Sequence, residues 1–137
     1  ISFKKGPVPI FPPNKKVKNF FNNLGTAIEI KNENLSLNFW TTSSMMAPFY
    51  EILNTFSQWL IKKGVKKESA QKYITSLFVA LSEDSLRKST DLKKLVKESQ
   101  TSKGLNEQSI NELRKLGFYT SLNKTAESIL RRLKKAK

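Results

Sequence analysis

Residues 26–50 read TAIEIKNENLSLNFWTTSSMMAPFY and contain the point at which the pattern of the chain changes from β to α. The first five residues alternate briefly between polar and apolar side chains, which predicts a short strand. After Asn32, a residue suited to cap a helix, the strand signals disappear. Pro48 then stands where the first turn of a helix accepts proline. The stretch therefore predicts a short β-containing segment followed by a mainly helical domain.

Residues 1–31 form the smaller of these two segments. GPVPIFPP, residues 6–13, is apolar with interleaved prolines, which permit an edge strand. Asn14 is placed to cap a short amphipathic helix that Gly25 ends, and residues 26–30 supply a second strand. Two strands and one short helix do not close a sheet layer alone. We interpret residues 1–31 as a β-α-β remnant of an α/β domain whose body precedes Ile1.

Residues 32–137 are predicted to be helical. Apolar residues recur at helical spacing in successive segments, and Gly64 and Gly117 each stand where such a segment ends. Asn106 is predicted to cap the helix that follows it. We detect no internal repeat, so the prediction is a single helical domain.

The residue types exclude several kinds of chemistry. The 137-residue chain has no cysteine and no histidine, which removes disulfides, thiolate chemistry, cysteine zinc sites and the commonest general base. We therefore expect no catalytic residue and no metal site in this chain. No apolar run approaches the roughly 20 residues that span a bilayer, and no signal peptide is visible. These features predict a cytoplasmic protein that does not contact a membrane.

The formal net charge of +14 invites a nucleic-acid interpretation. However, only four of the 25 basic residues are arginine, the side chain best suited to reading bases and phosphates. The lysines are spread over nearly every segment, as expected for solvated helix faces. We predict no nucleic-acid partner and keep as an alternative a non-catalytic basic helical module that binds nucleic acid or a protein.

Two polar segments are candidates for binding a ligand. The first is TTSS at 41–44, before a helix that starts near proline, and the second is the loop KESQTSKGLNEQSI at 97–110. A helix start offers free backbone N–H groups and a partial positive charge to an anionic or carbonyl group. From the residues alone, ordinary helix junctions remain the alternative. The candidate substrate-binding residues are Ser43, Ser44, Thr101, Ser102, Gly104, Asn106 and Glu107.

The order of these segments resembles the pyrroline-5-carboxylate reductase family. NNLGTAIEIKNENLSLNFWTTSSMMAPFYEI, residues 22–52, is similar to the junction between the Rossmann domain and the helical dimerisation domain of that family. Its S-G-S-G-P-A-Y motif is matched here at the first Ser, the second Gly, the Pro and the Tyr by Ser44, Ala47, Pro48 and Tyr50. QTSKGLNEQSI, residues 100–110, falls on the S-P-G-G-T-T substrate loop, and KLGFYTSLNKTAESILRRL, residues 115–133, on the closing turn and final helix.

This resemblance implies a fold, an activity and partners. The fold would be a helical dimerisation domain like the C-terminal domain of 6-phosphogluconate dehydrogenase, at 32–137, behind the end of an NAD(P)-binding Rossmann domain, at 1–31. The full-length protein would use NADP or NAD to reduce a cyclic imine, in proline biosynthesis or a related reaction, and would form a homodimer through the helical domain. The dinucleotide-binding G-x-G-x-x-G is absent from the chain, which alone is expected to bind no cofactor and to be inactive.

The loop departs from the pattern of the family. Lys103 stands for its proline, Leu105 for its second glycine, and Asn106 and Glu107 for its threonine pair. In the family the loop holds a substrate carboxylate with backbone N–H and threonine hydroxyl groups, whereas Glu107 would put a negative charge at the same helix start. The loop is therefore expected to be a substrate loop altered for a different imine.

Overall fold

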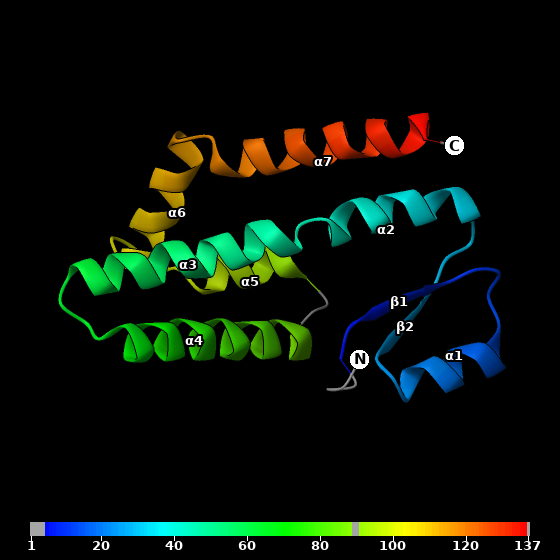
Figure 1. Ribbon diagram of the computed structural model, residues 1–137, viewed down its shortest axis with the longest axis horizontal. Coiled ribbons are helices and arrows are strands. Elements are labelled where there is room, and N and C mark those ends of the chain that lie inside the picture. Colours follow the sequence, from blue (N-terminus) through cyan, green and yellow to red (C-terminus); the bar gives the residue numbers. More distant parts are fainter. Residues whose placement is uncertain (1–4, 89–90, 137) are drawn as a thin grey trace. The chain divides into compact units, whose positions relative to one another are not determined.

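The computed structural model describes residues 5–88 and 91–136, and it is mainly helical, as predicted (Figure 1). The elements before the long helices are strand β1 (Pro7–Ile10), helix α1 (Lys15–Asn22), strand β2 (Thr26–Glu29) and a 3-10 helix, η1 (Glu33–Leu35). The helices that follow are α2 (Ser36–Ser43), α3 (Met46–Lys62), α4 (Lys67–Arg87), α5 (Leu92–Glu98), α6 (Leu105–Lys115) and α7 (Phe118–Lys135).

The chain forms two compact units. The first comprises Ile1–Met45 and Lys124–Lys137, and the second comprises Met46–Asn123. The candidate loop at 97–110 belongs to the second unit, and the hydroxyl cluster at 41–44 belongs to the first. The predicted boundary after residue 31, between a Rossmann remnant and a helical domain, concerns the origin of the segments and stays a prediction.

The β-α-β segment is present as predicted. Strands β1 and β2 pair in parallel, with Pro7 opposite Thr26 and Ile10 opposite Glu29. Helix α1 connects them, and the Asn14 side chain caps it by accepting hydrogen bonds from the backbone N–H groups of Lys16 and Val17. A β-α-β crossover is the unit from which parallel sheets are built. The chain therefore contains the repeating element of an α/β domain in its smallest form.

The centre of the second unit is the α3–α4 hairpin, whose two helices lie side by side (Figure 1). Gly64 has φ +93° at the turn between them, a conformation that glycine adopts without a Cβ clash. Ser57 and Ala70 are buried, and their small side chains let the two helices approach closely. Phe78 of α4 packs against Phe49 and Phe56 of α3, with ring centroids 6.0 and 6.3 Å apart. The hairpin is the most extensive helix–helix contact described in the second unit.

The hairpin leaves bulky apolar side chains exposed to solvent. Trp59 on α3 is 56% exposed and Tyr73 on α4 is 63% exposed, and Phe56 and Leu77 are also exposed. Exposed apolar side chains of this size on a small helical unit are candidates for contact with another protein surface. In the described part of the chain, no helix is long and apolar enough to cross a membrane.

Candidate functional site

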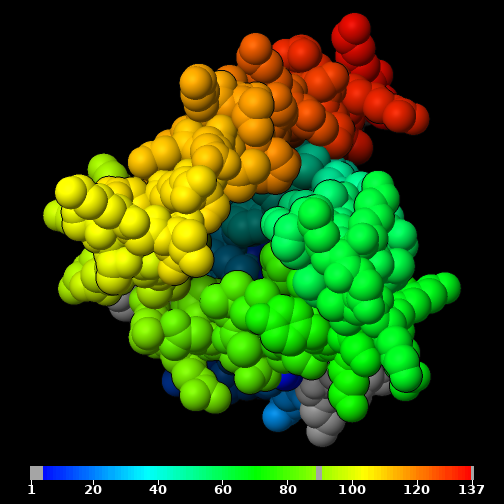
Figure 2. All heavy atoms as spheres, turned by 90° about the vertical axis from the view of Figure 1, so that its left-hand side faces the viewer, coloured from blue at the N-terminus to red at the C-terminus, as the bar shows by residue number. Residues whose placement is uncertain are grey.

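The loop between α5 and α6 is held by short-range bonds of its own backbone and side chains. Helix α5 ends at Glu98, and the N–H of Gly104 donates to the carbonyl oxygen of Thr101 over 2.8 Å. A Cβ on residue 104 would overlap the Thr101 hydroxyl and lie 2.9 Å from the Thr101 carbonyl oxygen, so the loop would have to shift to accept a larger residue here. Gly104 is the N-cap of α6, in an extended conformation. The surface of the loop and of α6 is exposed on the face that Figure 2 shows, in yellow.

Glu107 lies in the first turn of α6 and folds back over the loop. Its Oε2 accepts a hydrogen bond of 2.7 Å from the backbone N–H of Lys103. A glutamate at the third position of a helix that reaches back to an N–H before the helix closes the helix start, as in a capping box. It also places a negative charge near the positive end of the helix dipole. The chain thus supplies its own carboxylate to the Lys103 N–H, just before α6.

The predicted role of Asn106 as a helix cap is wrong. Gly104 occupies the N-cap position, without a side-chain capping bond, and Asn106 lies inside the first turn. Its Nδ2 donates instead to the carbonyl oxygen of Ser99, across the loop, over 2.9 Å. The extended conformation of Gly104 lets the helix begin two residues earlier than the asparagine signal indicates. Asn106 therefore ties α6 to the end of α5.

Lys103 has a backbone conformation that is rare for a residue with a side chain. Its φ is +59°, in the left-handed region. Proline, which stands at this point in the resembling family, has φ fixed near −65° and no N–H to donate. The turn seen here could not be made by proline, and the bond from the Lys103 N–H to Glu107 would be lost with it.

Restoring proline in Lys103→Pro is therefore expected to destabilise the loop by about 3 kcal/mol, since it removes an N–H donor and forces φ away from its present value. Lys103→Gly is the matched control, because glycine accepts positive φ and keeps the N–H; it should be neutral or stabilise by about 1 kcal/mol. Urea unfolding followed by circular dichroism measures both changes. A Lys103→Pro variant as stable as wild type would show that the loop turns differently.

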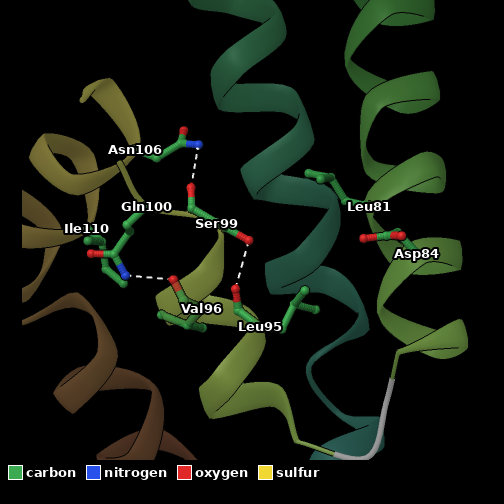
Figure 3. Close-up of a pocket in the computed structure, with 8 residues that line it drawn as sticks. All are labelled: Leu81, Asp84, Leu95, Val96, Ser99, Gln100, Asn106 and Ile110. Atoms are coloured by element: carbon green, nitrogen blue, oxygen red, sulfur yellow. Dashed lines mark hydrogen bonds between the residues drawn. The ribbon is translucent and has the colours of Figure 1, made fainter. Parts of the chain in front are cut away.

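A small pocket of about 290 Å³ lies beside the loop, between α4, α5 and α6 (Figure 3). Leu81 and Asp84 reach toward it from α4, and most of the exposed wall is apolar. Asp84 is the only charged residue among those that line it, and its carboxylate also pairs with Lys88 at 3.0 Å, on the surface. The remaining lining residues are Leu95, Val96, Ser99, Gln100, Asn106 and Ile110.

Two polar side chains in this pocket, which directly follow α5, are already bonded to that helix. The Ser99 hydroxyl donates to the carbonyl oxygen of Leu95, and Gln100 Nε2 donates to that of Val96, at 2.8 and 2.6 Å. The Ser99 oxygen and the Gln100 carbonyl keep capacity to accept, and Asp84 also accepts. The described lining therefore offers acceptors and apolar contact, with no cation. Such a pocket suits a small apolar molecule that carries a hydrogen-bond donor or a positive charge.

The sequence candidates divide between the two units. Of those on the loop, Asn106 lines the pocket, whereas Thr101, Ser102, Gly104 and Glu107 form the neighbouring turn and helix start. Ser43 and Ser44 belong to the end of α2 and its cap in the first unit. Their hydroxyls donate to the carbonyl oxygens of Phe39 and Thr41, at 3.0 and 2.6 Å. These bonds are typical of hydroxyl side chains near helix ends.

Sequence reasoning missed the contribution of α4. Asp84 and Leu81 lie one helical turn apart, which places them on one face of α4. From the sequence, Asp84 is an ordinary surface acid, because nothing local relates it to the loop some twenty residues later. Ser99 and Gln100 lie in the candidate loop at 97–110, but they are not among the candidate substrate-binding residues. In the described residues, no group of three histidine, cysteine, aspartate or glutamate side chains is placed to hold a metal.

Comparison with known proteins shows which protein family and which solved structures the chain resembles. A family model described as pyrroline-5-carboxylate reductase dimerisation matches residues 34–136. A pyrroline-5-carboxylate reductase structure from Coxiella burnetii superposes with a TM-score of 0.81 at 18% identity, covering 98% of this chain and 53% of that one. No curated protein sequence matches the chain closely enough to count as a relative.

Two further solved structures have a similar fold. A pyrroline carboxylate reductase from Plasmodium falciparum with NADP bound gives a TM-score of 0.73 at 17% identity, covering 95% of this chain and 52% of that one. A 1-pyrroline-5-carboxylate reductase from Streptococcus pyogenes gives 0.76 at 14% identity, covering 95% and 53%. The chain spans about half the length of these proteins, and at such identities they show its fold alone. Since the family model covers most of its length, the chain belongs to the pyrroline-5-carboxylate reductase dimerisation family.

Proposed function

We propose that the chain is the dimerisation and substrate-binding part of an NAD(P)-dependent oxidoreductase that reduces a cyclic imine. The family match over residues 34–136 supports the dimerisation role, and the fold shared with reductases from three organisms supports the activity. In this proposal residues 1–31 are the end of an NAD(P)-binding Rossmann domain, and residues 32–137 are the helical domain, which forms a homodimer. Proline biosynthesis or a related imine reduction is the metabolic setting.

The nicotinamide cofactor would be held by residues outside this chain. A dinucleotide needs a glycine-rich turn between a strand and a helix, where the backbone can approach the pyrophosphate. The connection from β1 to α1 contains Pro12, Pro13 and Asn14 and no glycine, so it does not fit that role. When bound, NADPH or NADH supplies the hydride. The role of this chain would be to orient the imine and to exclude unsuitable substrates.

The single observation that carries the substrate assignment is the bond between Glu107 and the N–H of Lys103. A carboxylate of the chain lies at the helix start where a substrate carboxylate would otherwise be bound. The two negative charges would repel each other there. The pocket beside the loop has Asp84 as its charged residue and no cation. Both features favour an imine without a carboxylate, neutral or protonated, over pyrroline-5-carboxylate. The substrate contacts of Ser43 and Ser44, which lie in the first unit, stay a prediction from the family resemblance.

The proposal is tested with the intact reductase that contains this chain. With NADPH or NADH, we expect steady oxidation of the cofactor in the presence of 1-pyrroline, which has no carboxylate, and a lower kcat/KM for pyrroline-5-carboxylate. The 137-residue chain alone serves as the control and should give no turnover. Failure to reduce any cyclic imine, with a correctly folded enzyme and either cofactor, would overturn the proposed activity.

A further inference from the structure

A second hollow, distinct in chemistry from the pocket of Figure 3, lies in the second unit along α5 and α6. It is an open groove of about 560 Å³. It shares Val96 and Gln100 with the pocket, so the two hollows adjoin each other. The other residues that line the groove are all charged, and they are Asp91, Lys93, Lys94, Lys97 and Arg114. The groove therefore gathers cations from two different helices around one space.

The positive charges of this groove are only partly neutralised. Asp91 uses one carboxylate oxygen to cap α5 by accepting from the Lys94 N–H, and the Lys94 ammonium lies 3.6 Å from Glu98. Among residues 5–88 and 91–136, the structure shows no carboxylate paired with Lys93, Lys97 or Arg114. Lys93 and Lys97 are four residues apart on one helix and therefore repel each other across one turn. An anion in the groove would relieve this repulsion.

The types of side chain indicate which anion fits. Arg114 offers a planar guanidinium fork that binds phosphate through two parallel hydrogen bonds, and the lysines offer mobile point charges. Lys93, Lys97 and Arg114, which form no ion pair within the described residues, match a ligand that carries several negative charges close together. The cations of the groove come from α5 and a single residue of α6 and surround one hollow, an arrangement that suits a compact anion better than a nucleic-acid backbone contacted at many phosphates. A compact polyphosphate satisfies both the charge and the size.

We propose that the groove between α5 and α6 binds a small polyphosphate anion, such as pyrophosphate or the phosphate chain of a nucleotide, through Lys93, Lys97 and Arg114. Binding would draw α5 and α6 together at one end, while the bond from Asn106 to the Ser99 carbonyl joins them at the other. The loop that the two helices flank would then be held more firmly. This site is independent of the proposed reductase activity and would exist in a chain that binds no imine.

The test is calorimetric titration of the 137-residue chain with pyrophosphate at low ionic strength. We expect binding by the wild type and a loss of at least about tenfold in affinity when Lys93, Lys97 and Arg114 are all changed to Gln. The matched control changes Lys15, Lys66 and Arg131 to Gln, removing the same charge from surfaces outside the groove, and should shift affinity by less than about twofold. Circular dichroism of both variants checks that the helices are retained.

Four results would overturn the proposal. The first is no binding of pyrophosphate by the wild type, and the second is equal weakening in the groove and control variants, which would show attraction to the net charge alone. The third is much tighter binding of a single-stranded oligonucleotide that both variants weaken alike, which would indicate a diffuse nucleic-acid surface. Adenosine triphosphate and citrate are titrated in the same way as pyrophosphate. Binding of the nucleotide like pyrophosphate, with weaker binding of citrate, supports a phosphate site, and equal binding of citrate contradicts it.

Discussion

In sedimentation velocity at micromolar concentration, the chain is expected to run as a dimer, and the variant with Trp59→Glu and Tyr73→Glu is expected to run as a monomer. More than half of each of these aromatic side chains is exposed on the α3–α4 hairpin. The family to which the chain belongs is named for dimerisation. An aromatic side chain buries about 150–250 Å² when covered, so the exposed half of each contributes about 2–3 kcal/mol at an interface. Losing both should weaken the dimer at least about a thousandfold.

Two control variants separate the loss of apolar contact from the added charge. Gln58→Glu and Gln71→Glu place the same negative charges on exposed positions of the same two helices, and the double control should remain a dimer. Circular dichroism would show that the Trp59 and Tyr73 variant keeps its helices, since neither side chain is part of the buried hairpin contact at Ala70 and Ile74. A wild-type chain that sediments as a clean monomer, or a double variant that stays dimeric, would contradict the assignment of this surface.

Much of the fold follows from local signals in the sequence. Asn14 caps α1 as predicted, and its side-chain oxygen accepts the expected backbone N–H groups. Asn32 caps the 3-10 helix η1, whereas α2 begins after Leu35 without a side-chain cap. Gly64 and Gly117 have positive φ at helix ends, as their positions indicated, whereas the prediction that Gly25 caps α1 is wrong, because Asn23 is the C-cap. These features depend on a few consecutive residues, and a single-residue signal is sufficient to specify them. The same is true of the parallel β-α-β unit, in which the prolines mark an edge strand.

The candidate site was less predictable because its geometry depends on residues far apart in the chain. Asn106 has the side chain of a helix cap, yet the extended backbone of Gly104 takes that position and the amide closes the loop instead. The pocket joins Asp84 on α4 to Asn106 on α6, and no periodic pattern relates the two. The basic groove is a similar case, since Arg114 meets the lysines of α5 only when the loop has folded. The composition gives the total charge of the chain, but it does not show that these basic side chains come together in one groove.

The largest change in catalytic behaviour is expected from the loop. In the intact reductase, Glu107→Thr combined with Leu105→Gly should raise kcat/KM for pyrroline-5-carboxylate by about ten- to a hundredfold and leave that for 1-pyrroline nearly unchanged. Removing the carboxylate frees the Lys103 N–H, which Glu107 now occupies at 2.7 Å, and removes a negative charge from the helix start. Two like charges about 4 Å apart cost near 4 kcal/mol at an effective dielectric constant of 20, and solvent at this half-exposed site reduces that value.

Glu107→Gln distinguishes charge from loop shape, because the amide oxygen can still accept from the Lys103 N–H while the negative charge is gone. If repulsion excludes the substrate carboxylate, this variant should recover a large part of the gain, mainly through a lower KM, since the interaction acts on binding in the ground state as well as in the transition state. If backbone access matters more, Leu105→Gly should recover more than Glu107→Gln, because glycine lets a ligand approach the helix start. Efficient reduction of pyrroline-5-carboxylate by the wild type, or an equal loss on both imines in the double variant, would contradict the altered specificity. In that case residues 101–107 would act only as a structural connection between α5 and α6, closed by Glu107 and Asn106.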